Sequence, residues 1–281
     1  MIRFLIPLGT ILFLSACLPT KADQTRKPAR LLFASGFEGI TLEPLKEGYQ
    51  RLSGTDSETG FSWPIEILGA SDSALHLIQH DRQKAVRNEI QTVTGHNGQP
   101  TRALYSAENY EYHDDTQSPY EILNITDGRR DLYIRYWIKL DRGSLTQPNK
   151  WRTFFEWKSK GYANGSGFRL ISFIYTDDDG KPYWHWEGDR DPEHPVWEID
   201  NRDIPVPMGK WFLTEFYWHW SEGKDGRALW KVNGQVVGDH FGPTTRNHKP
   251  IDFIMLTQIY GNANPKYQWV DDIEIWDGLP D

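Results

Sequence analysis

The segment Asp131–Leu140 reads DLYIRYWIKL, and its side chains alternate between two kinds. Its even positions from 132 to 138 carry leucine, isoleucine and tyrosine, whereas its odd positions from 133 to 139 carry tyrosine, arginine, tryptophan and lysine. Successive side chains of a β-strand point to opposite faces, so a period of two predicts a strand with one face in a core.

Further segments on both sides of this strand are rich in aromatic and β-branched residues, as strands are. They are Leu31–Ala34, Ala74–Gln79, Phe168–Tyr175, Lys210–Trp220, Arg227–Val232, Ile251–Tyr260 and Tyr267–Trp276. Asn233-Gly234 predicts a tight hairpin turn. No window sustains the spacing of an amphipathic helix over three turns. The pattern predicts an all-β protein, and at this length a jelly-roll β-sandwich of two antiparallel sheets.

The amino terminus predicts export. Arg3 is followed by a short apolar run to Leu14, which is too short to cross a bilayer as a helix. Leu14-Ser15-Ala16-Cys17 resembles a bacterial lipobox, which implies cleavage before Cys17 and lipidation of its thiol. Cys17 is also the only cysteine in the chain, so no intrachain disulfide can form.

These features divide the chain into a signal peptide (1–16), a polar lipidated tether (17–30) and one jelly-roll domain (31–281). Leu18 after the cysteine resembles the outer-membrane sorting pattern of enteric-type bacteria. We therefore expect a lipid-anchored monomer of the bacterial cell envelope, at the periplasmic or surface face of the outer membrane. Its only membrane contact would be the lipid. The formal net charge of −8 argues against a nucleic-acid partner.

Five segments, in order along the chain, resemble concanavalin A-like jelly-roll polysaccharide lyases of the heparin lyase I and alginate lyase type. They are 32–39 (LFASGFEG), 86–90 (VRNEI), 205–211 (PVPMGKW), 225–234 (DGRALWKVNG) and 269–276 (WVDDIEIW). The resemblance runs from about Leu31 to Trp276. It implies cleavage of an acidic, uronate-containing polysaccharide by β-elimination.

The resemblance also implies a structural calcium ion that joins the first and last strands. Glu38 and Asp271 would be its ligands, together with backbone carbonyl groups near Gly39. Carboxylate and carbonyl oxygens suit a hard cation that takes six to eight oxygen ligands. The same acids could instead belong to a solvated strand start without any metal.

The catalytic residues of such lyases include an arginine, an amide, a histidine and a tyrosine. Arg87 matches the arginine, with Glu89 as its orienting partner, and Tyr260 matches the tyrosine. Lys158 stands where the histidine is expected; it could neutralise the substrate carboxylate or act as a base. Otherwise His185 or His219 would have to enter from a neighbouring strand.

Substrate contacts are expected from aromatic and polar residues of the same strands, because flat rings stack on sugars. The candidates are Trp157, Trp186, Trp218, His219 and Gln258. Most of the 13 tryptophans could equally fill the core.

Two other functions are known possibilities for such a fold, and the sequence favours the first of them over the second. A non-catalytic carbohydrate-binding lipoprotein would use the same aromatic surface without turnover. A retaining glycosidase would need two rigidly held glutamates about 5 Å apart, and the E-x-D-x-x-E strand of such enzymes is absent.

Overall fold

The computed structural model describes most of the chain after residue 27. The described residues are 28–45, 49–65, 76–78, 86–108, 121–124, 129–143, 145–159, 161–191, 193–249, 251–255, 259, 261–263 and 266–280. The predicted signal peptide and Cys17 lie outside them. Within this part of the chain, no helix is long and apolar enough to span a membrane.

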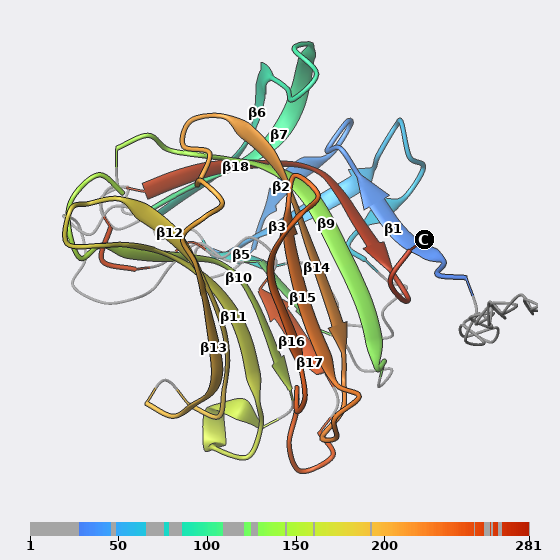
Figure 1. Ribbon diagram of the computed structural model, residues 1–281. Helices are drawn as coiled ribbons and strands as arrows, with labels where there is room; N and C mark the ends of the chain where they lie inside the picture. Colours follow the sequence, from blue (N-terminus) through green and yellow to red (C-terminus); the bar gives the residue numbers. More distant parts are fainter. Residues whose placement is uncertain are drawn as a thin grey trace, which may run out of the picture.

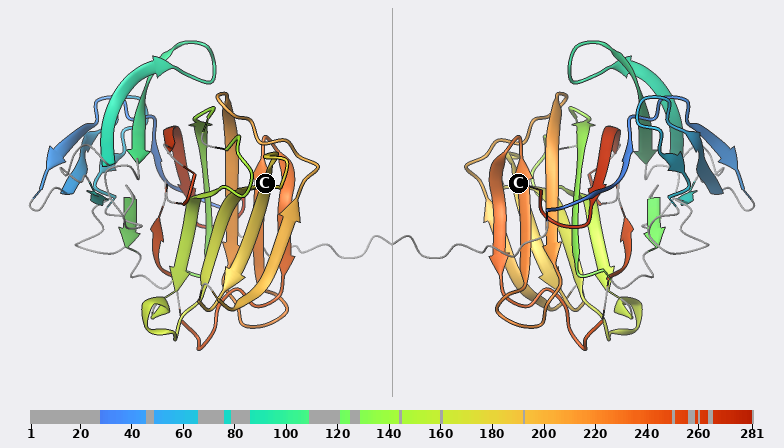
Figure 2. Two further views of the ribbon diagram at one scale, coloured as in Figure 1. Left: turned by 90° about the vertical axis from the view of Figure 1, so that its left-hand side faces the viewer. Right: turned by 90° about the vertical axis from the view of Figure 1, so that its right-hand side faces the viewer.

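The described residues form two antiparallel sheets that pack face to face (Figures 1 and 2). The eight-stranded sheet has the order β16 (Gln235–Phe241), β15 (Arg227–Val232), β14 (Trp211–His219), β9 (Asp131–Leu140), β18 (Lys266–Trp276), β7 (Pro100–Glu108) and β6 (Val86–Thr94), and β1 (Leu31–Ser35) also pairs with β18. The predicted all-β sandwich of two antiparallel sheets is confirmed.

The ten-stranded sheet forms the other layer. Its order is β13 (Pro195–Asn201), β12 (Pro182–Asp189), β11 (Arg169–Thr176), β10 (Trp151–Ser159), β17 (Ile251–Met255), β8 (Glu121–Asn124), β5 (His76–Ile78), β3 (Tyr49–Thr55) and β2 (Thr41–Pro44), and β4 (Ser62–Trp63) pairs with β3. The helical content of the described residues is one 3₁₀ turn, η4 (Tyr162–Asn164).

The period-two pattern of β9 fixes its orientation as predicted. Leu132, Ile134 and Ile138 are completely buried between the sheets. The hairpin between β15 and β16 also forms as predicted. Its two central residues, Asn233 and Gly234, have φ angles of 48° and 77°, the left-handed values that a two-residue type I′ turn requires.

Large rings from the two sheets meet in the core. Phe155 of β10 stacks on Phe216 of β14 with 4.0 Å between ring centroids, and Trp157 stacks on Trp218 at 5.1 Å. Trp157, Trp186 and Trp218 are at most 1% exposed. The prediction that these three tryptophans contact substrate is therefore wrong. The alternation was read correctly, but the face with the tryptophans is the face that packs against the other sheet.

Candidate functional site

The predicted catalytic residues lie on different sheets. Arg87 and Glu89 form an ion pair on β6, at the edge of the eight-stranded sheet, and the Arg87 guanidinium lies 5.9 Å from the Tyr105 ring centroid. Lys158 and His185 lie on β10 and β12 of the ten-stranded sheet. The structure therefore does not bring the Arg87–Glu89 pair together with Lys158 and His185.

The remaining predicted residues do not complete one constellation. His219 lies on β14 of the eight-stranded sheet, with Nδ1 at 2.9 Å from Oδ1 of Asp131. Gln258 and Tyr260 lie outside the described residues, while Ile259 between them is buried. The candidate site therefore consists of Lys158, His185 and their neighbours on β10–β13.

The side of β10–β13 that faces away from the core is here called the outer face. Strand pairing sets its side chains in rows that cross the strands. At one end, Arg169 of β11 lies between Lys158 of β10 and Asp189 of β12. The tryptophans at 157, 184 and 186 take the inward positions of these strands, so their polar neighbours take the outward ones.

An unbroken chain of ion pairs runs across the outer face from Lys158 to His185. Nζ of Lys158 lies 2.6 Å from Oε1 of Glu156, and the same oxygen lies 3.8 Å from the Arg169 guanidinium. Arg169 lies 4.0 Å from Glu187, and Oε2 of Glu187 lies 3.3 Å from Nε2 of His185. Lys158 and His185 thus belong to one network, although they do not touch.

Burial perturbs the acids of this network. Burial raises the pKa of Asp189 to about 7, assisted by a hydrogen bond with Glu187 and opposed by Arg169, whose Nε donates to Asp189 at 2.9 Å. Burial would also raise the pKa of Glu187, but hydrogen bonds with His185 and Asp189 outweigh it and lower the value. Between the two acids, Glu187 is therefore the one that carries the negative charge toward His185.

Tyr162 of η4 packs on the cationic end of the network. Its ring centroid lies 5.1 Å from Nζ of Lys158 and 5.2 Å from the Arg169 guanidinium carbon. Burial raises the pKa of the Tyr162 phenol, and the charge of Asp189 adds to this while Arg169 opposes it. The hydroxyl group therefore keeps its proton at neutral pH.

A row of aromatic rings forms the other end of the outer face. Trp151 pairs with Tyr175, and Tyr175 pairs with Tyr183. The ring centroids are 6.5 Å and 6.0 Å apart, with interplanar angles of 28° and 24°. All three side chains are partly exposed. Sequence reasoning missed this row, although a period of two sets Tyr183 on the face of β12 opposite to Trp184 and Trp186.

The predicted calcium ligands lie close together at the bulge of β18. Burial raises the pKa of Asp271 to about 7, and the charges of Asp272 and Glu38 raise it further. Glu38 accepts a hydrogen bond from the Arg102 backbone at 3.0 Å, and Asp271 accepts one from the Thr101 hydroxyl at 2.9 Å. A buried carboxyl group with two further acids beside it fits a hard divalent cation, which would compensate their charges.

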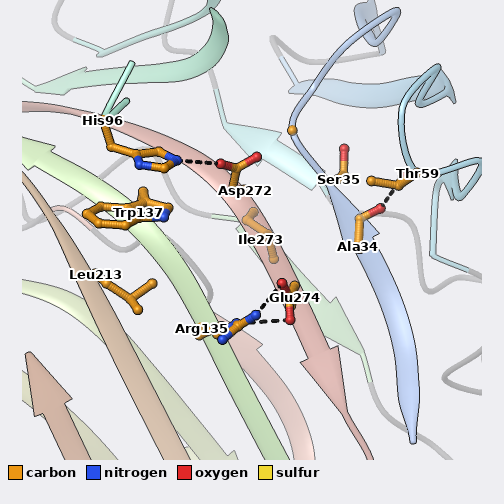
Figure 3. A pocket seen from close by; sticks show the side chains of 11 residues that line it. Ala34, Ser35, Thr59, His96, Arg135, Trp137, Leu213, Asp272, Ile273 and Glu274 are labelled. Atoms are coloured by element: carbon orange, nitrogen blue, oxygen red, sulfur yellow. Dashed lines mark hydrogen bonds and ion pairs between the residues drawn. The ribbon is translucent and has the colours of Figure 1, made fainter. Parts of the chain in front are cut away.

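A separate cavity of about 380 Å³ opens beside β1, β9, β14 and β18 (Figure 3). His96 stacks on Trp137 at 4.0 Å and lies 3.0 Å from Asp272. On its other side, Arg135 donates two hydrogen bonds to Glu274, at 2.6 and 2.9 Å. The charged and polar groups named here thus bind one another across the cavity wall.

No family model matches the sequence, and no curated protein matches it. Solved structures do resemble it. The structure of the alginate lyase Aly36B has a TM-score of 0.52 at 15% identity, over 67% of this chain and 82% of the lyase. A variant of that lyase in complex with an alginate trisaccharide has a TM-score of 0.51 at 16% identity, over 67% and 83%. At this identity the likeness shows that the chain has the β-jelly-roll fold of such polysaccharide lyases.

Proposed function

We propose that the protein binds an acidic polysaccharide along the outer face of β10–β13 and cleaves it by β-elimination. The observation that carries the proposal is the shared location of a cationic cluster and a ring row. Lys158, Arg169 and Tyr162 lie at one end of the face, and three partly exposed rings lie at the other. Rings stack on sugar faces, and cations bind uronate carboxylates.

The reaction requires three chemical roles. A base removes the proton α to the uronate carboxylate, a cation neutralises that carboxylate, and an acid protonates the departing 4-oxygen as the carbon–oxygen bond breaks. We assign carboxylate neutralisation to Lys158, assisted by Arg169. We assign the acid to Tyr162 because its ring packs on Lys158 and Arg169, whose charges would stabilise the phenolate that forms as the proton leaves.

We assign the base to Tyr260, on its resemblance to the tyrosine of the lyases. The strand β17 that precedes it pairs with β10, with Phe253 opposite Lys158. His185 keeps its nitrogen atoms within an acidic network, where burial opposes its protonation but hydrogen bonds with Glu187 and Asp200 outweigh burial and raise its pKa. A histidine that holds its proton is a poor base, so we assign His185 no proton abstraction.

We also propose a structural calcium ion at Glu38 and Asp271, which accept hydrogen bonds from β7 of the eight-stranded sheet. Attachment to the envelope through Cys17 is likewise a proposal, as is the monomeric state. The tether of residues 17–30 would hold the sandwich near the membrane, within reach of extracellular or periplasmic polymers.

A non-catalytic glycan-binding function is the second candidate, and the ring row favours it. Trp151, Tyr175 and Tyr183 can hold a polymer without any proton transfer. The separation of Arg87 and Glu89 from Lys158 also removes the arginine that the lyase resemblance implied.

One assay separates these functions. The purified protein is mixed with alginate, polyglucuronate and heparin-like polymers, and the absorbance of the unsaturated uronate product is followed. The proposal predicts a rise on at least one polymer that disappears in Tyr260→Phe and falls at least tenfold in Tyr162→Phe. Lys139→Met, on the eight-stranded sheet, is the matched control and should retain turnover. Binding without any absorbance rise would replace the lyase with the glycan-binding protein.

A further inference from the structure

His185, Glu187 and Glu198 bring three potential metal donors together on adjacent strands. Their ligand atoms all lie within 4.8 Å of one another. Strand pairing sets Glu187 of β12 opposite Glu198 of β13, and His185 lies two residues from Glu187 on the same face. Nε2 of His185 is 3.3 Å from Oε2 of Glu187 and 3.6 Å from Oε1 of Glu198.

The second ring nitrogen of His185 is held by a carboxylate. Nδ1 lies 2.7 Å from Oδ1 of Asp200, which is the strand partner of His185 on β13. Histidine ligands of metals usually donate their other ring N–H to a carboxylate, which fixes the tautomer and leaves the opposite nitrogen for the metal. Tyr175 and Phe173 pack on the imidazole at centroid distances of 5.1 and 5.7 Å and hold its orientation.

The two distances from Nε2 of His185 to the glutamates are close to the ligand separation around a tetrahedral zinc ion. Two ligands bound at about 2.0–2.1 Å around a tetrahedral ion lie about 3.3–3.4 Å apart, and zinc has these bond lengths. One imidazole and two carboxylates suit zinc or a similar first-row ion, whereas calcium prefers oxygen ligands alone. Three protein ligands leave a fourth tetrahedral position for water or a ligand oxygen.

The ion-pair network around these three donors contains more acidic than basic side chains. Within the described residues, the ion pairs of the outer face connect the carboxylates of Glu156, Asp177, Glu187, Asp189, Glu198 and Asp200. The permanent cations in the same pairs are Lys158, Arg169 and Arg202. Six acids thus face three permanent cations and His185. Because His185 has a raised pKa and Asp189 has a pKa of about 7, a small excess of negative charge remains for a metal ion to offset. A bound divalent ion would offset this excess and add to the attraction that Lys158 and Arg169 provide for an acidic polymer.

We propose that His185, Glu187 and Glu198 bind a divalent first-row transition-metal ion, with zinc as the best fit, and that Asp200 orients His185. Metal binding by these residues does not depend on whether the protein is a lyase. The further role of the ion, which is to present its open position to a uronate carboxylate, rests on the proposed function.

The site can be tested with metal alone. Untagged protein, stripped with a chelator, is titrated with Co²⁺ while visible absorption is recorded, and with Zn²⁺ in a calorimeter. We expect one ion per chain, intense absorption typical of tetrahedral Co²⁺ and displacement of Co²⁺ by Zn²⁺. His185→Gln should abolish the absorption, and Glu198→Gln should weaken affinity at least tenfold.

The variants are chosen so that folding does not obscure the result. The Glu198 side chain is 53% exposed, so its loss should leave the fold intact even if His185→Gln destabilises the sheet. His194→Gln is the matched control, because His194 forms an exposed pair with Asp191 at 2.7 Å outside the proposed donor set. Absence of binding, or equal binding by the wild type and Glu198→Gln, would overturn the site.

Polymer is added only in a second stage, so the two proposals fail separately. If the metal binds but the polymer is neither bound nor cleaved, the site stands and the proposed function falls. If turnover is unaffected by chelation and no metal binds, the metal site falls and the lyase stands. If the metal binds and uronate affinity rises at least fivefold with it, both are supported.

Discussion

Nζ of Lys158 lies 2.6 Å from Oε1 of Glu156, a carboxylate whose side chain is only 1% exposed. The two residues are separated by Trp157, which points into the core. The partly exposed ammonium group is therefore held at the surface by a buried acid, and the position of the lysine on the outer face is fixed by strand geometry. Substitutions at Lys158 and Glu156 should therefore affect stability and polymer binding separately.

Replacing Lys158 by methionine should reduce polymer binding or turnover at least tenfold, because the carboxylate-binding cation is lost. It should also lower the free energy of unfolding by about 1–3 kcal/mol, since Glu156 keeps Arg169 nearby but loses its closest cation. Denaturant unfolding and polymer titration measure the two effects. The double variant Lys158→Met/Glu156→Gln should recover stability but not binding. Recovery of binding in the double variant would remove Lys158 from the site.

Tyr175→Ala and Tyr183→Ala should each weaken polymer affinity about 3- to 10-fold, which corresponds to the roughly 0.5–1.5 kcal/mol of a ring contact. The rings form a row on β11 and β12, so the longest oligosaccharides should lose most. Affinity electrophoresis or calorimetry with oligosaccharides of increasing length measures this. Tyr105→Ala, a partly exposed tyrosine of the eight-stranded sheet, is the control. An equal loss in Tyr105→Ala would place the polymer elsewhere.

Chelation should lower the melting temperature if calcium binds at Glu38 and Asp271. An ion present at 100 times its dissociation constant stabilises the folded state by about 2.7 kcal/mol. Differential scanning calorimetry with and without added Ca²⁺ measures the shift. Glu38→Gln should abolish the calcium-dependent part, whereas Asp225→Asn, on an exposed turn, should preserve it. A wild type with no response to Ca²⁺ would leave the carboxyl groups as ordinary strand-end acids.

The alternation of apolar and polar residues predicted much of the sandwich, because the two faces of a strand can be recognised from the residues of that strand alone. Leu132 and Ile134 were correctly placed on one face of their strand, and the structure buries that face. The hairpin at Asn233-Gly234 was equally local. What alternation leaves open is which face of an aromatic strand points inward. The choice of Trp157 as a substrate contact was wrong because its partner Trp218 lies 61 positions away and was not visible in the strand itself.

The candidate site was harder to predict, since it depends on which strands share a sheet. Val86–Thr94 and Trp151–Ser159 are both strands, yet one pairs with β7 and the other with β11 and β17. That pairing sends Arg87 and Lys158 to different layers. Arg169, which joins the Lys158 and His185 ends of the network, was missed for the same reason, because its role comes from lying between two neighbouring strands.

A buried ion pair of the eight-stranded sheet should make stability depend on pH. Lys266 of β18 and Glu108 of β7 are strand partners, their side chains are fully buried, and Nζ lies 3.0 Å from the carboxylate. Burial lowers the pKa of Lys266 from 10.5 to about 8, although Glu108 opposes the shift. The folded chain therefore binds fewer protons than the unfolded chain between about pH 8 and 10.5. The free energy of unfolding should rise with pH across that window, by at most about 3 kcal/mol.

The double variant Lys266→Met/Glu108→Gln isolates this effect. At pH 7 it should be as stable as the wild type or more stable, because a buried ion pair costs desolvation that apolar packing avoids. Lys266→Met alone should lose about 3–5 kcal/mol, since it leaves the buried Glu108 without this cation. Urea unfolding at several pH values from 7 to 10.5 measures the difference between wild type and double variant. The wild type should gain stability relative to the double variant as the pH rises. A constant difference would mean that Lys266 stays protonated throughout and that the network around it, rather than burial alone, sets its charge.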